Sequence, residues 1–77
     1  MTLERIIGFE FLDFEDLFDE VEQCVGDNVI SHSDVYHLDK GDNNLNEVCL
    51  YTDRKHLDVI IEYDRNTNEI MDAYIND

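Results

Sequence analysis

The segment between Asp13 and Gly26 constrains the fold of this 77-residue chain more than any other. Its apolar residues recur at the three- and four-residue spacing of an α-helix: Phe14, Leu17, Phe18, Val21, Cys24 and Val25. Asp13 has the side chain that an N-cap needs, and Gly26 takes the left-handed conformation that ends a helix. The pattern predicts a helix over 14–25 with one apolar face, which another element must cover.

The C-terminal part of the chain alternates apolar and polar residues as β-strands do. Strands are expected over 47–53, 57–63 and 69–75. The links between them, 53–56 and 64–68, have the length and composition of hairpin turns. This region therefore predicts a three-stranded antiparallel meander.

The alternation also predicts which side chains face the helix. In the last strand, Met71, Ala73 and Ile75 are expected on the helix side, with Ile70 and Tyr74 on the outer side. The helix should then cover the inner face of the meander, because both surfaces are apolar.

The rest of the chain has weaker patterns. Residues 6–12 read as an extended segment, and a short helix over 3–7, capped by Thr2, is the alternative. Residues 28–38 are weakly strand-like, and 39–44 have the composition of a turn. We therefore expect a single α+β domain over residues 1–77: one amphipathic helix packed on a small antiparallel sheet, formed by the three-stranded meander plus one or two N-terminal strands.

The charge balance excludes several classes of function. With 20 acidic and 5 basic residues the net charge is −15, whereas direct binding to nucleic acid or to an anionic membrane needs clustered Lys and Arg. A hydrophobic content of 43% is too high for a disordered acidic tail. We therefore expect a folded protein with a strong negative field, and neither nucleic acid nor membrane as a direct partner.

The compartment is predicted from segments that the sequence lacks. There is no basic start followed by an apolar run, as in a secretory signal, and no apolar stretch that could span a membrane. Without export, Cys24 and Cys49 are expected as reduced thiols. These features predict a cytoplasmic protein.

Catalysis and metal binding find little support. A chain this short has no room for a deep cleft in which carboxylate pKa values could be pushed apart. The spacing Asp64-x-Asn66-x-Asn68 starts like a calcium loop, but Glu69 and Ile75 stand where that loop needs Gly and Glu. No cysteine pair has zinc-finger spacing. We expect no enzyme activity, no cofactor and no metal.

The predicted helix carries a solvent face made almost entirely of carboxylates. These are Glu15, Asp16, Asp19, Glu20 and Glu22, and no Lys or Arg occurs from Leu12 to Ser31. Like charges at spacings of three and four destabilise a helix, and solubility alone needs a net charge of only about 2–8. The helix is about 18 Å long, a length along which one DNA strand has about five phosphates. The five carboxylates are therefore candidate phosphate substitutes.

Three acids of the meander form a secondary candidate set. Asp58, Glu62 and Asp72 are expected on the outer face of the sheet, where they would extend the negative surface. The partner expected from both sets is the basic groove of a nucleic-acid-binding protein or nuclease complex.

The acidic run from Asp13 to Glu22, followed by the strands within 47–75, resembles the small acidic inhibitors of phages and mobile elements that mimic DNA, of the anti-CRISPR or anti-restriction type. The resemblance lies in charge, size and expected layout. It implies a non-enzymatic inhibitor, acting in a bacterial cytoplasm, that blocks a nucleic-acid channel.

Two other functions are compatible with the same sequence. An immunity protein or antitoxin that neutralises a cationic toxin would need the same acidic surface. A protein–protein adaptor would instead use exposed apolar residues, for which Ile60, Ile70 and Tyr74 are the candidates, and a homodimer contact could form there too.

Overall fold

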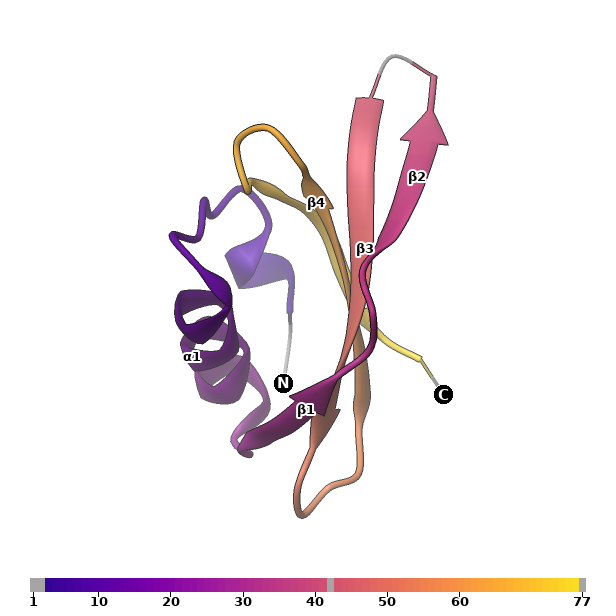
Figure 1. Cartoon of the computed structure of the whole chain (residues 1–77). Helices are drawn as coiled ribbons and strands as arrows, with labels where there is room; N and C mark the ends of the chain where they lie inside the picture. Colours follow the sequence, from indigo (N-terminus) through magenta and orange to yellow (C-terminus); the bar gives the residue numbers. More distant parts are fainter. Residues whose placement is uncertain (1–2, 42, 77) are drawn as a thin grey trace.

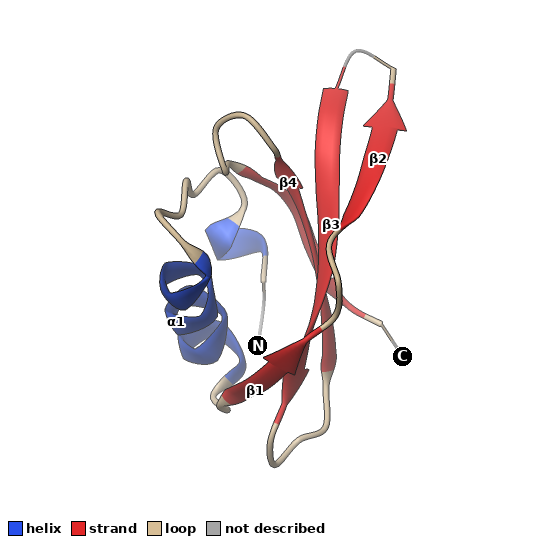
Figure 2. Ribbon diagram, viewed as in Figure 1, coloured by secondary structure: helices blue, strands red, loops and turns tan. Residues whose placement is uncertain are grey.

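One helix packs on one face of a five-stranded antiparallel sheet (Figures 1 and 2). The structure is a computed structural model that describes residues 3–41 and 43–76. The elements, in chain order, are the short 3-10 helix η1 (Glu4–Ile6), α1 (Phe14–Val25), β1 (Val29–His32), β2 (Tyr36–Lys40), β3 (Asn43–Thr52), β4 (Asp58–Asp64) and β5 (Ile70–Ile75). The expected α+β class and the β3–β4–β5 meander are thereby confirmed.

Helix α1 begins and ends where the sequence predicts. The Asp13 carboxylate accepts the backbone N–H of Asp16 at 2.9 Å, and Gly26 lies in the left-handed region with φ of 68°. Leu17, Val21 and Val25 are buried against the sheet. The apolar stripe therefore covers the inner sheet face, as expected.

Strand β3 is the longest and organises the sheet. It pairs along one edge with β4 and along the other with both β1 and β2. The weakly strand-like region 28–38 thus contains two strands, separated by a short break at which the Ser33 hydroxyl accepts the Cys49 N–H at 3.0 Å. The expected turn over 39–44 is wrong in extent, because β2 continues to Lys40 and β3 already begins at Asn43.

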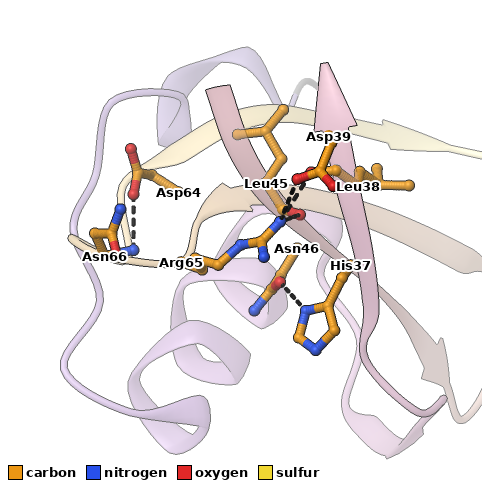
Figure 3. A network of polar contacts seen from close by, with 8 residues as sticks. All are labelled: His37, Leu38, Asp39, Leu45, Asn46, Asp64, Arg65 and Asn66. Carbon is orange, nitrogen blue, oxygen red and sulfur yellow. Dashed lines mark hydrogen bonds and ion pairs between the residues drawn. The ribbon is translucent and has the colours of Figure 1, made fainter. Parts of the chain in front are cut away.

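The β2–β3 hairpin projects past the helix layer at one end of the sheet (Figure 1). An arginine from the β4–β5 turn holds its base (Figure 3). The Arg65 guanidinium Nη2 donates to the carbonyls of Leu38 at 3.0 Å and Leu45 at 3.2 Å, and to the Asp39 carboxylate at 3.2 Å. One of the five basic residues is therefore used to join two hairpins.

The N-terminal segment differs from the expected strand. Residues 4–6 form η1, and only an isolated bridge between Glu10 and Glu69 has strand character. Gly8, with φ of 95°, turns the chain away from an extended path. The alternative of a short helix is closer to the structure, although its suggested cap, Thr2, lies outside the described residues.

Strand β5 contains an irregularity that reverses one side-chain assignment. The pairing with β4 shifts between Glu62 and Tyr63, so that Tyr63 lies opposite Ile70 while Glu62 lies opposite Asp72. Ile70 is therefore fully buried in the core, and Met71 is 40% exposed. The expected placement of Ile70 outside and Met71 inside is wrong, because the extra residue changes the alternation of the strand at that point.

Candidate functional site: two acidic faces

The five predicted helix acids lie on the solvent side of α1. Glu15 and Asp19 are exposed, while Asp16, Glu20 and Glu22 are half-buried. No basic residue lies in the last turn of the helix. The structure therefore brings all five together on one face, as the helical period predicts.

Two of these five carboxylates also have local structural roles. One oxygen of Asp16 accepts the Leu12 N–H at 2.9 Å, and one oxygen of Glu22 accepts the Val29 N–H at 2.8 Å. These bonds tie the segments before and after α1 to the helix. Glu15, Asp19 and Glu20 are consequently the members whose substitution disturbs the fold least.

The three predicted sheet acids lie on the face of the sheet opposite α1. Val59, Ile61 and Tyr63 of β4 belong to the core shared with the helix, so the alternating residues of that strand point the other way. Asp58 and Glu62 are on this outer face, and so is Asp72, which pairs with Glu62. The helix acids and the sheet acids therefore form two separate faces rather than one surface.

Exposure differs strongly among the sheet acids. Asp72 is exposed, Asp58 is half-buried, and Glu62 retains only 6% of its accessible surface. Glu62 lies on the central strand of the meander, between Glu47 of β3 and Asp72 of β5. It contributes charge to the face but offers a partner little direct contact.

The register adds an acid that the sequence analysis missed. Glu47 of β3 lies directly opposite Glu62, which lies directly opposite Asp72, so three carboxylates follow one another across β3, β4 and β5. Like charges in opposite positions destabilise a sheet. Alternation alone places Glu47 on the outer face, but only the register places it in a row with the other two.

An open depression of about 450 Å³ lies where α1 ends. Its lining consists of Asp19, Glu22, Gln23, Gly26, Asp27, Asn28 and Arg54. The lining is polar and faces solvent, so it offers no water-excluded place in which a carboxylate could act as a general acid or base.

Asp27, at the edge of this depression, has a structural role. Its carboxylate accepts backbone N–H groups of Lys55 at 2.7 Å, Arg54 at 3.0 Å and Asn28 at 2.9 Å. The bond from Lys55 is the main cause that lowers the pKa of Asp27, with burial acting in the opposite direction. Asp27 thus fastens the β3–β4 hairpin to the end of the helix.

Cys49 lacks the environment of a nucleophile. Burial raises the pKa of the Cys49 thiol, with further contributions from nearby acids, whereas a reactive cysteine needs a lowered pKa. In the described part of the chain, no group of three or more His, Cys, Asp or Glu side chains is arranged to hold a metal ion. No helix within residues 3–41 and 43–76 is long and apolar enough to cross a membrane.

Comparison with protein-family models, with curated proteins and with solved structures finds no match to this chain.

Proposed function

We propose that this protein is a non-enzymatic inhibitor whose surface carboxylates take the place of nucleic-acid phosphates in the basic groove of a nuclease or DNA-binding protein. The observation that carries the proposal is the solvent face of α1, where five carboxylates gather and no basic side chain of the helix compensates them. A partner with a basic groove would supply the missing positive charge.

The dimensions of the molecule support this proposal. Its long axis measures 37 Å, close to one turn of B-DNA at about 34–36 Å. A duplex of that length carries about 22 phosphate charges, at one per ~1.7 Å of axis. The chain carries 20 acidic side chains and a net charge of −15 on a body of that length, so its charge approaches that of the duplex it would replace.

The fold also suits a rigid competitor. The helix is capped at both ends, and its apolar stripe is buried against the five-stranded sheet. The backbone positions that carry the carboxylates are therefore held at nearly constant spacing before the partner arrives. Such preorganisation lowers the entropy cost of binding.

The first test is competition. The protein is used to capture partners from a bacterial lysate, and excess duplex DNA is then added to the captured complex. We expect DNA to displace the protein, because both would occupy the same groove. A captured partner that has no nucleic-acid groove, such as a cationic toxin, would contradict the proposal and favour an immunity protein or antitoxin.

The second test uses matched charge variants. Glu15→Gln, Asp19→Asn and Glu20→Gln are combined in one variant, and Glu10→Gln, Asp34→Asn and Asp53→Asn in a control with the same net charge. Exposed ion pairs contribute about 0.2–1 kcal/mol each, so losing three of them should weaken binding of the helix variant to the captured partner by about 3- to 160-fold. Equal loss in both variants would mean that only net charge matters and that α1 is not the contact face.

The adaptor alternative loses part of its expected surface. Ile70 belongs to the core, and Ile60, although on the outer face, retains only 8% of its accessible surface. Of the three residues expected to form an apolar patch, only Tyr74 is exposed. Few of the expected apolar side chains on this face are therefore exposed enough to form an interface driven by apolar burial.

A further inference from the structure

The outer face of the sheet combines carboxylates with exposed aromatic rings. Tyr36 of β2 lies opposite Glu47 in the register, so the carboxylate row continues onto an aromatic residue. On the neighbouring row Tyr74 lies opposite Ile60, next to Asp72 along β5. Tyr36 and Tyr74 are 59% and 41% exposed. The row from β2 to β5 is thus bordered by a tyrosine ring near each end.

No helix covers this face within the described residues, and the view in Figure 1 shows α1 on the opposite side. With neighbouring strands about 4.8 Å apart, the row of four residues spans roughly 14 Å. That length accommodates a short stretch of a partner's chain rather than a single side chain. The face is therefore large enough to be a docking surface.

The charge of the face limits what can occupy it. A second copy of this chain would set like charges against each other, and an apolar segment would remove the water from carboxylates without pairing them. Nucleic acid is repelled for the same reason as a second copy. Only a cationic segment both offsets the charges of the exposed Asp72 and the half-buried Glu47 and tolerates the burial of these two carboxylates.

The two tyrosines distinguish between the two kinds of cationic segment. A guanidinium is planar, bonds a carboxylate through two N–H groups and stacks on an aromatic face, whereas an ammonium is a compact and strongly hydrated charge. Aromatic rings beside carboxylates therefore favour arginine over lysine.

We infer that the outer face of the sheet is a docking surface for an arginine-rich segment of the partner protein, with Tyr36 and Tyr74 stacking on guanidinium groups that pair with Glu47 and Asp72. This rests on the proposed function, since the partner is a basic protein in both. The inference assigns to the two tyrosines a preference for arginine over lysine, which phosphate mimicry by charge alone would not produce.

The test compares an arginine homopeptide with a lysine homopeptide of equal length and charge. Binding to the intact protein is measured by calorimetry at one ionic strength, and the contacted residues are mapped from amide shifts in NMR spectra. We expect the arginine peptide to bind about fivefold tighter or more, given the strength of exposed cation–π contacts. Its largest shifts should fall on β2, β3 and β5.

Two matched variants isolate the aromatic rings. Tyr36→Leu with Tyr74→Leu keeps apolar side chains but removes the rings, and should bring the two peptide affinities together. Tyr36→Phe with Tyr74→Phe keeps the rings and should retain the preference. Equal affinities in the parent protein, a preference that survives in the leucine variant, or shifts confined to α1 would each overturn the inference.

Failure of the docking surface and failure of the proposed function can be told apart. If DNA fails to displace the captured partner while the arginine preference persists in a ring-dependent manner, the docking surface stands and the mimicry does not. If DNA displaces the partner but the two peptides bind alike, the mimicry stands and the docking surface does not.

Discussion

At the scale of single residues, the acids of this chain fall into two groups: some accept backbone hydrogen bonds, and others are exposed to solvent. Asp13, Asp16 and Asp27 accept backbone N–H groups that would otherwise lack partners at the ends of α1 and at the β3–β4 hairpin. Glu15 and Asp19 are exposed on the helix. A high count of acids therefore does not by itself measure the size of a binding surface.

Asp27 allows a test of the structural role by pH. Its pKa is lowered in the folded protein, so the unfolded chain binds the proton more readily near its ordinary pKa of about 3.9. The stabilisation that Asp27 provides is therefore complete above that pH and is lost as the pH falls through the lower, folded pKa. We expect Asp27→Asn to lower Tm at neutral pH by more than Asp53→Asn does. Asp53 is the matched control because it is exposed and lies on the β3–β4 hairpin that Asp27 contacts.

The measurement is Tm by circular dichroism for the parent and both variants across acidic to neutral pH. The gap in Tm between the parent and Asp27→Asn should begin to narrow as the pH drops below about 4, because Asp27 is then protonated in the unfolded chain. It should close at still lower pH, where the folded parent protonates Asp27 as well. A gap that stays constant with pH would show that the carboxylate charge is not what holds the hairpin.

At the scale of elements, the irregularity in β5 decides which of two adjacent residues is in the core. Ile70→Ala should destabilise the fold by about 2–4 kcal/mol, because it empties a fully buried position. Met71→Ala should cost less than about 1 kcal/mol, because that side chain is 40% exposed. Urea unfolding of both variants measures the two losses in the free energy of unfolding. A larger loss in Met71→Ala than in Ile70→Ala would mean that β5 alternates regularly, with Met71 in the core.

The outer edge of β5 has a feature that limits association with other strands. The Asp72 carboxylate accepts the N–H of Ala73 at 2.9 Å, so it occupies a backbone donor of the last strand in the sheet order. Charged side chains on edge strands oppose edge-to-edge pairing. We expect Asp72→Ala to self-associate at concentrations where the parent does not, as measured by sedimentation or light scattering; Asp34→Ala, elsewhere on the surface, should behave like the parent.

At the scale of the whole molecule, the net charge of −15 opposes the compact state through self-repulsion. Added salt screens exposed charges, so Tm should rise from low to physiological ionic strength. Binding to a basic partner should weaken over the same range, since the attraction is screened as well. Opposite trends of stability and affinity with salt are the expected signature, and an affinity indifferent to salt would point to an apolar interface.

Much of the fold could be predicted from local patterns. The helix over 14–25, with its caps at Asp13 and Gly26, is confirmed because a helix depends on interactions within a few residues of each other. The three C-terminal strands are confirmed because the alternation of apolar and polar residues is visible within each segment, with shifts of a few residues at their ends. The N-terminal segment was harder to predict, because Leu3 and Ile6 are placed by contacts with distant parts of the core.

The sequence by itself determined the charge, the acidic face of the helix and the class of the fold, because periodicity and composition are local properties. Only the tertiary structure decided that Glu47 joins Glu62 and Asp72 in one row and that Ile70 is inside. These depend on strand register, which is set by packing between residues far apart in the chain, and a shift of one residue moves a side chain to the other face of a sheet.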